Sequence, residues 1–344
     1  MKKETHKQKI SWWQWLLMLA LAVLLLYFAF KGIKWQDFIQ GIKSCNFWWI
    51  GAVLIISIVP YALRALRWRL LMLPINKDIT FLESFDAVNV MSITNFAIPR
   101  GGEIARCGVI AATKKMSFEK ALGTVIVERA FDILTLFVVI IGIVIGSDAF
   151  RKFISEKIFG LSSNSGHATY FWLIILGITF LAAMLLFLIT KNRQKLENKK
   201  AFAKLYKILD GLKDGLLSGF RMKRKWEFFL YTALMWICYW LMSLFSIYAF
   251  PQINDLHLGG MDAACLMVTG SLGWLVPVQG GIGAYHFIIS LALTYIYGIE
   301  HSIGIVFATI SHETQAFTML LCGTLSLVHI SISKRKTNKL KNYN

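Results

Sequence analysis

Charged side chains that could hold a phosphate gather at a proline–glycine break in the first half of the chain. The break runs from Asn95 to Arg106 and reads NFAIPRGGEIAR. Arg100 can donate two parallel hydrogen bonds to a phosphate, and Glu103 and Arg106 have the i,i+3 spacing of neighbours on a helix. A helix that begins after Gly102 would add the positive end of its dipole. The break therefore has the chemistry of a phosphate site, and an ion-pair network that only fixes the break is the alternative interpretation.

A second break lies far downstream and contains the same helix-breaking residue types. The first segment is interrupted at Pro99, Gly101 and Gly102, and the second at Pro277, Gly280, Gly281 and Gly283. Proline and glycine end helices and free backbone groups, which hydrocarbon tolerates only where they face protein or a wet cavity. The polar side chains of the second break are Gln279, Tyr285 and His286. We expect paired broken helices around a polar site at membrane depth, with His286 either titrating near neutral pH or serving as a hydrogen-bonded structural residue.

Three further charges lie inside a later apolar segment. Glu128 is expected about 16 Å along its helix, at 1.5 Å per residue. Asp132 shares its face at i,i+4, and Arg129 lies beside them. Charges at such depth are costly unless they are paired, so we expect Arg100 or Arg106 as partners. A carboxylate here could instead receive a cationic headgroup or a proton.

Three arginines and one polar pair complete the charges near apolar segments. Arg64, Arg67 and Arg69 end a segment, where arginines usually serve as topology anchors; a lipid-phosphate clamp is the alternative. His312 and Glu313 lie deep in the last segment, but the sequence HETQA lacks the second histidine of a zinc-protease motif. The five cysteines show no CxxC spacing, so we expect no disulfide framework, no metal site and no cofactor.

The composition is that of an integral membrane protein. Hydrophobic residues make up 56% of the 344 and charged residues 16%, whereas soluble domains carry about 45–50% and about 25%. The net charge of +18 comes from lysines and arginines that cluster beside apolar segments, which is the positive-inside pattern. No nucleic-acid-binding module is visible. The chain is therefore expected to bind membrane lipids and not nucleic acid.

The apolar segments divide into full spans and shorter pieces, at roughly 20 residues per crossing. Full spans are expected at 12–30, 47–63, 117–145, 170–189, 226–250 and 302–330, and shorter pieces at 81–98, 102–112, 261–276 and 282–298. Ser117 is expected to cap its helix, and residues 31–46 and 147–169 to form polar connections. The predicted fold class is an all-α polytopic membrane protein with about six full spans plus two broken or re-entrant helix pairs, about eight apolar segments in all.

Lysine and arginine counts predict the orientation of the membrane domain at 12–330. A basic N-terminus at 1–11, a basic tail at 331–344 and a basic amphipathic helix at 191–225 are expected in the cytoplasm. With both termini there, the cytoplasmic segments hold 25 Lys and Arg and the outside segments hold 6. The sequence therefore predicts a multi-pass protein of the bacterial inner membrane with cytoplasmic N and C termini.

Three features recur in register and predict an internal repeat. A proline follows a span at Pro74 and at Pro251, an Asp-Ala pair follows at Asp86 and at Asp262, and a break comes next in each case. The proposed repeats cover about 47–146 and about 226–330. Because they would enter the membrane from opposite sides, we expect an inverted repeat, a pattern that points to a transport site near the midplane.

Together these motifs resemble one known family. Asn95…Pro99-Arg100-Gly101-Gly102-Glu103…Arg106, Val127-Glu128-Arg129-Ala130-Phe131-Asp132 and Pro277…Gly280-Gly281-Ile282-Gly283 are similar to the lysylphosphatidylglycerol synthetase transmembrane-region family, also called the flippase-like domain family. The resemblance implies a membrane domain that moves an aminoacylated lipid between leaflets. Only 14 residues follow Ile330, so a standalone member without the aminoacyl-transferase domain is expected.

Three functions remain open at this point. The first is a flippase or scramblase-like transporter that moves a phospholipid or a polyprenyl-linked glycolipid headgroup through a cavity lined by Arg100, Glu103, Glu128 and Arg129. The second is a membrane transferase on a lipid phosphate, with Glu128 or Asp132 as general base. The third is a non-catalytic scaffold for a separately encoded lipid-modifying enzyme. Lipids, such an enzyme and a second copy of the chain are the candidate partners, and transport is favoured over catalysis.

Overall fold

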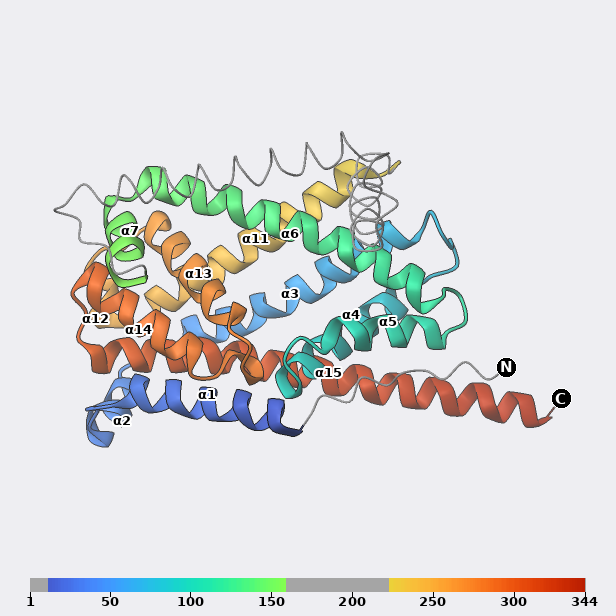
Figure 1. Cartoon of the computed structure of the whole chain (residues 1–344), viewed down its shortest axis with the longest axis horizontal. Helices are drawn as coiled ribbons and strands as arrows, with labels where there is room; N and C mark the ends of the chain where they lie inside the picture. Colours follow the sequence, from blue (N-terminus) through green and yellow to red (C-terminus); the bar gives the residue numbers. More distant parts are fainter. Residues whose placement is uncertain (1–11, 159–222, 344) are drawn as a thin grey trace, which may run out of the picture. The chain divides into compact units, whose positions relative to one another are not determined.

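The computed structural model describes residues 12–158 and 223–343 (Figure 1). All regular elements in these ranges are helical. Five of the described helices are long and apolar enough to cross a membrane, or six if the bent pair α1–α2 forms one span. The predicted all-α polytopic class is therefore confirmed. The span expected at 170–189, the N-terminal segment 1–11 and nearly all of the amphipathic helix expected at 191–225 lie outside the described residues.

The helix bounds follow the chain in two described stretches. The first stretch contains α1 (Trp12–Phe30), α2 (Trp35–Lys43), α3 (Phe47–Met72), α4 (Phe81–Ala97), α5 (Gly102–Ala112), α6 (Phe118–Gly146), α7 (Asp148–Phe153) and the π-helical turn η1 (Ile154–Ile158). The second contains α11 (Lys225–Tyr248), α12 (Pro251–Asn254), α13 (Gly260–Leu275), the 3-10 turn η3 (Gln279–Gly281), α14 (Ala284–Tyr297) and α15 (His301–Tyr343).

Both breaks lie where the sequence predicts them. Helix α4 ends at Ala97 and α5 begins at Gly102, within one residue of the expected 81–98 and 102–112 pieces. The Ser117 hydroxyl accepts a hydrogen bond from the backbone N–H of Lys120 at 3.4 Å, so the predicted cap of α6 is confirmed.

The connection expected at 31–46 is largely helical. Helix α2 bends by 84° from α1, at a turn that contains Gly32 with a φ of 84°. Its apolar residues Phe38, Ile39 and Ile42 share one face and pack against the core, while Lys43 complements the dipole at its end. Residues 31–46 are polar on average, so their mean hydropathy does not indicate the amphipathic helix that they contain. The connection expected at 147–169 likewise begins with a helix, α7.

Two spans are longer than expected. Helix α3 continues past the predicted end at residue 63 and carries Arg64, Arg67 and Arg69 in its last turns. Helix α15 continues through the basic tail to Tyr343 and does not end near residue 330. Arginine and lysine are good helix formers, so a change from apolar to basic residues does not itself end a helix.

The chain divides into two compact units. Unit 1 comprises Met1–Ala62, Phe85–Val109 and Trp236–Asn344, and unit 2 comprises Leu63–Ser84 and Ile110–Met235. Each unit takes residues from both proposed repeats, so the inverted repeat stays a prediction.

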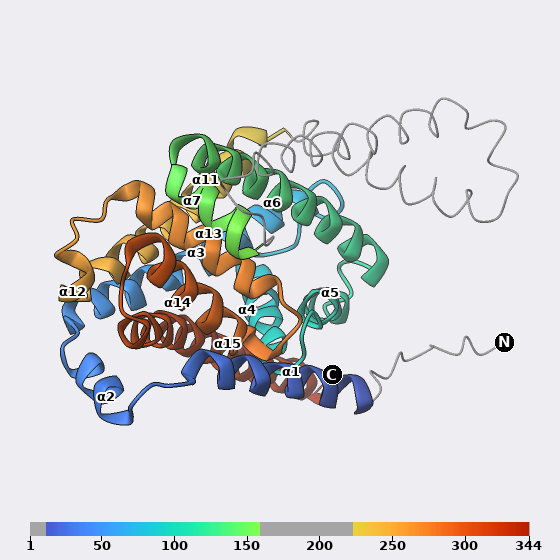
Figure 2. The same cartoon turned by 60° about the vertical axis from the view of Figure 1, so that its left-hand side comes forward.

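In unit 1, helix α14 packs against α13, α15 and α1, and α2 packs against α15 (Figure 2). Its core includes the fully buried side chains of Ile289, Leu293, Ile305 and Phe250. This packing holds the second break, which leads directly into α14.

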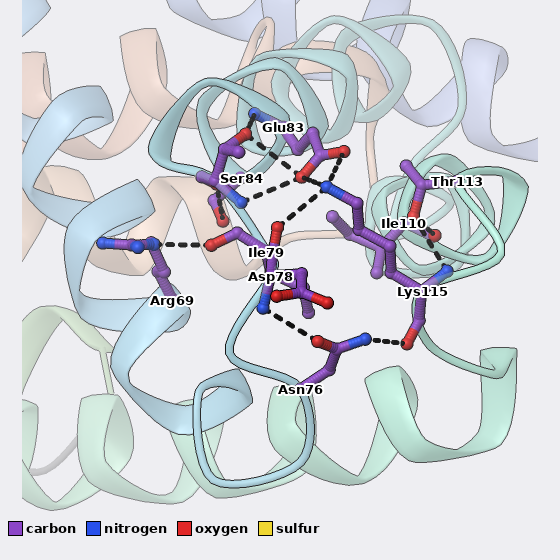
Figure 3. A network of polar contacts seen from close by, with 10 residues as sticks. Arg69, Asn76, Asp78, Ile79, Glu83, Ser84, Ile110, Thr113 and Lys115 are labelled. Atoms are coloured by element: carbon purple, nitrogen blue, oxygen red, sulfur yellow. Dashed lines mark hydrogen bonds and ion pairs between the residues drawn. The ribbon is translucent and has the colours of Figure 1, made fainter.

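Unit 2 contains a polar network that ties together the connections before α4 and after α5 (Figure 3). The Lys115 ammonium lies 2.9 Å from the Glu83 carboxylate and donates to the carbonyl of Asp78 at 2.8 Å. The Asn76 amide donates to the carbonyl of Lys115 at 2.8 Å. Burial by itself raises the pKa of Glu83, but the hydrogen bonds from Lys115 and Thr80 outweigh it and lower the pKa below its usual value.

Candidate functional site

In unit 1 the two breaks meet. The Arg100 guanidinium donates through Nη2 to the carbonyl oxygen of Leu275, the last residue of α13, at 2.8 Å. The ring of Phe96 lies so close to Gly280 that a Cβ placed on Gly280 would come within 2.7 Å of it. We call residues 95–102 together with residues 275–286 the break junction. Residues far apart in the sequence thus form one local structure.

Backbone strain and side-chain caps shape the first half of the break junction. Arg100 has a φ of 60°, which a residue with a side chain rarely adopts and which costs of order 1–3 kcal/mol. Its hydrogen bond to the negative end of the α13 dipole offsets part of this cost. The Asn95 side chain accepts from the backbone N–H of Gly102 at 2.8 Å and so caps α5. Because this N–H is already bonded and Glu103 occupies the first turn, the start of α5 is a weaker anion site than the sequence predicted.

Two groups at the break junction retain hydrogen-bonding capacity. The Arg100 side chain is exposed, and its bond to Leu275 uses one of the five guanidinium N–H donors. The amide nitrogen and oxygen of Gln279 are buried, and neither has a hydrogen-bond partner among the described residues. A buried unpaired amide is uncommon in a folded protein, so the Gln279 side chain keeps a donor and an acceptor for a further polar group.

Aromatic and imidazole rings lie next to the junction on α14 and α15. The ring centroid of His312 lies 5.0 Å from that of His286 and 5.3 Å from that of Tyr285. The His312 Nε2 donates to the carbonyl of Gly280 at 2.8 Å, and its Nδ1 lies 3.0 Å from a carboxylate oxygen of Glu313. The hydrogen bond from His312 Nε2 to the Gly280 carbonyl fixes the turn that contains Gly280, whose φ is 56°. His286 is buried, and its predicted structural role and its predicted titration both stay open.

Unit 2 holds a buried cluster of charges on α3 and α6. The Arg67 guanidinium lies 2.9 Å from Glu128 and 2.7 Å from Asp132. Arg129 lies 3.4 Å from Glu128 and 3.3 Å from Asp132, and Arg64 lies 3.9 Å from Glu128. Arg67 and Glu128 are fully buried. These five residues form what we call the arginine–carboxylate cluster.

Two neighbours from α11 complete the surroundings of Arg67. Its Nη1 donates to the Thr232 hydroxyl at 3.3 Å, and its guanidinium lies 5.5 Å from the centre of the Phe228 ring. Hydrogen bonds and ion pairs compensate the cost of burying a guanidinium, and the cation–π contact adds to this stabilisation. Arg67 is therefore a buried, paired cation whose side chain does not extend to the protein surface, and its role as a topology anchor stays a prediction.

The α3 arginines lie on the same helix as the apolar span before them, because α3 does not end at residue 63 but continues to Met72. Once the helix is continued, Arg64 and Arg67 share a face at i,i+3, and Glu128 and Asp132 share one at i,i+4. The charged faces of these two helices are complementary, and this complementarity is the sequence signal that predicts the cluster. A further pairing of these carboxylates with Arg100 or Arg106 stays a prediction.

The predicted site residues thus fall into two groups. Unit 1 contains seven of them: Asn95, Arg100, Glu103, Arg106, Gln279, Tyr285 and His286. Unit 2 contains the other three: Glu128, Arg129 and Asp132. Arg106 is fully buried on α5, whereas Glu103 is partly exposed one turn before it. One cavity lined by residues of both groups stays a prediction.

Comparison with known proteins connects these features to a family. The sequence profile described as "Lysylphosphatidylglycerol synthase TM region" matches residues 15–323, nearly the whole chain. No curated protein and no solved structure matches the chain. The matched range contains both breaks and the arginine–carboxylate cluster, so the resemblance inferred from these motifs is confirmed.

Proposed function

The chain belongs to the lysylphosphatidylglycerol synthase TM-region family, and from this premise we propose that it is a flippase-like or scramblase-like transporter for the headgroup of a lipid. The family implies a lipid-related function in the membrane. The proposal adds that the break junction receives a phosphate-containing headgroup while the acyl chains stay in the surrounding lipid. Phospholipids and polyprenyl-phosphate-linked glycolipids both present this phosphate.

The observation that carries the proposal is the pair of open polar groups at the break junction. Arg100 is fixed by one hydrogen bond, which leaves further N–H donors of its exposed guanidinium for a phosphate. Gln279 offers a buried amide with both a donor and an acceptor for the rest of a headgroup. Helix breaks of this kind in membrane proteins line polar sites.

The arginine–carboxylate cluster has a supporting role in this proposal. Glu128 accepts hydrogen bonds from Arg67 and Arg129 on the same oxygen. A carboxylate oxygen that already accepts from two guanidinium groups is poorly placed to remove a proton from a substrate. This argues against the transferase alternative, in which Glu128 would remove a proton, and supports a role in holding α3 against α6.

The orientation of the chain belongs to the same proposal. The lysine and arginine distribution supports cytoplasmic N and C termini in the bacterial inner membrane. In this orientation the two breaks would begin from opposite sides of the bilayer, as in transporters built from inverted repeats.

A reconstituted flip assay tests the proposal. Full-length protein is placed in liposomes that contain a phospholipid or a polyprenyl phosphate with a fluorescent label, and a membrane-impermeant reductant reports how fast label reaches the outer leaflet. We expect protein-dependent flipping for one lipid class and a loss of at least about tenfold in Arg100→Ala, since a charge-assisted contact contributes about 1.5–3 kcal/mol.

Arg151→Ala is the matched control, because Arg151 is an exposed arginine paired with Asp148 outside the break junction. It should flip lipid at the wild-type rate. Wild-type rates equal to those of protein-free liposomes for both lipids would overturn the proposal. Formation of a modified lipid from an activated donor, lost in Glu128→Gln, would establish the transferase instead.

A further inference from the structure

We propose that His286, His312 and Glu313 form a binding site for a divalent first-row transition-metal ion of the zinc class. One nitrogen of each histidine and one carboxylate oxygen lie within 4.8 Å of one another. His286 belongs to α14 and His312 and Glu313 to α15, all within unit 1. This inference goes beyond the proposed transport and does not depend on it.

Hydrogen bonding determines which nitrogen of His312 is free for a ligand. Its Nε2 lies 2.8 Å from the carbonyl oxygen of Gly280, and a carbonyl oxygen can only accept, so Nε2 carries the hydrogen. In the neutral ring Nδ1 then has a lone pair, and it lies 3.0 Å from the acceptor oxygen of Glu313. The lone pairs on His312 Nδ1 and on the Glu313 oxygen repel each other at this distance unless a positive charge lies between them. That charge is either a metal ion or a proton.

His286 distinguishes the metal ion from the proton. Its side chain is 3% exposed, and its Nδ1 has no hydrogen-bond partner among the described residues. A proton shared by His312 and Glu313 would leave this buried nitrogen unsatisfied. A metal ion instead takes one ligand atom from each of the three residues, because imidazole nitrogen and carboxylate oxygen are common ligands of zinc.

The surroundings of the three residues match those of known metal sites. A histidine ligand usually donates its other N–H to a carbonyl or carboxylate, as His312 does to Gly280. Trp274 stacks on the His312 ring at 5.3 Å and 22°, which restrains its orientation. Glu313 is 57% exposed and so provides a route by which an ion can enter.

The required movement is small. Two ligands of one tetrahedral zinc ion, each about 2.0–2.1 Å away, lie about 3.4 Å apart. The present separations, at most 4.8 Å, therefore need shifts of about 1 Å in the side chains. Two histidines and one glutamate would leave a fourth position for water or another ligand, as in other His₂Glu sites.

The test measures binding of Zn²⁺ alone to full-length protein in detergent. The protein is purified through a tag without histidines and stripped with a chelator. Equilibrium dialysis followed by elemental analysis then gives the zinc bound per chain. We expect about one zinc per chain in the wild type, and affinity at least about tenfold weaker in His286→Gln and in Glu313→Gln.

His257→Gln is the matched control, because His257 is exposed and lies outside the three-residue group. It should bind zinc like the wild type. Glu313→Gln keeps the test valid if His286→Gln fails to fold, since Glu313 is exposed. A folded wild type that binds no zinc would overturn the proposal. Zinc binding by Glu313→Gln equal to that of the wild type would also overturn it. So would a dependence of the free energy of unfolding on pH that zinc does not alter, because that result would indicate a shared proton and no metal ion.

Discussion

Replacing Arg67 by methionine should destabilise the protein more than any exposed arginine substitution. Methionine keeps much of the side-chain volume but removes the charge that lies 2.9 Å from Glu128 and 2.7 Å from Asp132. Removing one partner of a buried ion pair costs about 3–5 kcal/mol, because the other charge stays buried and uncompensated. Arg64 and Arg129 still face Glu128 at 3.9 and 3.4 Å. We therefore expect the lower end, about 3 kcal/mol.

A double-mutant cycle shows whether this cost comes from the pairing. Glu128→Gln leaves Arg67 bonded to Asp132, so we expect a smaller loss of about 2 kcal/mol. The double variant removes both members of the pair and should lose about 3 kcal/mol in total, which gives a coupling energy of about 2 kcal/mol.

The assay is unfolding by titration with sodium dodecyl sulfate in mixed micelles, followed by tryptophan fluorescence. Arg151→Met is the control and should cost less than about 1 kcal/mol, as exposed ion pairs do. A loss below about 1 kcal/mol for Arg67→Met, or losses that simply add in the double variant, would refute the reasoning.

Further predictions concern the first break and the polar network of unit 2. A Cβ at Gly102 would clash with the backbone carbonyl of Met91, so Gly102→Ala should lower the free energy of unfolding by about 1–3 kcal/mol. Gly108→Ala, on the same helix with open space around it, should raise it by about 0.5–1 kcal/mol; equal effects of the two in a thermal unfolding assay would contradict this account. The pKa of Glu83 is lowered in the folded state, so its stabilising contribution is present above its unfolded pKa of about 4.3 and is lost as pH falls through the lowered value. Lys115→Met removes the ion pair, so the loss in free energy of unfolding between pH 5 and pH 3 should be smaller than in the wild type, by under about 1 kcal/mol. The same dependence of the free energy of unfolding on pH in both proteins would refute this prediction.

The sequence predicts this fold well where proline and glycine mark an end. The pattern from Pro99 to Gly102 places the end of α4 and the start of α5 to within one residue, because these residues act locally on the backbone. Ser117 acts in the same local way as the cap of α6. Apolar-to-polar changes were weaker signals, since α2 is helical within a polar segment and α15 continues through a basic one.

Contacts between distant segments could not be predicted in the same way. The bond from Arg100 to Leu275 depends on how the two breaks approach each other in space. The closeness of His286 and His312 depends on the packing of α14 against α15, which periodicity alone does not determine. Composition identifies a membrane protein, whereas tertiary packing determines which polar groups share a site.

The most direct test of the lipid-headgroup site is native mass spectrometry of the full-length protein, extracted gently from its host membrane. Wild type, Arg100→Ala and Arg151→Ala are compared for the lipids that remain bound. Binding through the break junction predicts one phosphate-containing lipid class on the wild type and on Arg151→Ala, and its loss from Arg100→Ala. The same unselective lipids on all three proteins would contradict the headgroup site and make the Arg100 bond to Leu275 purely structural.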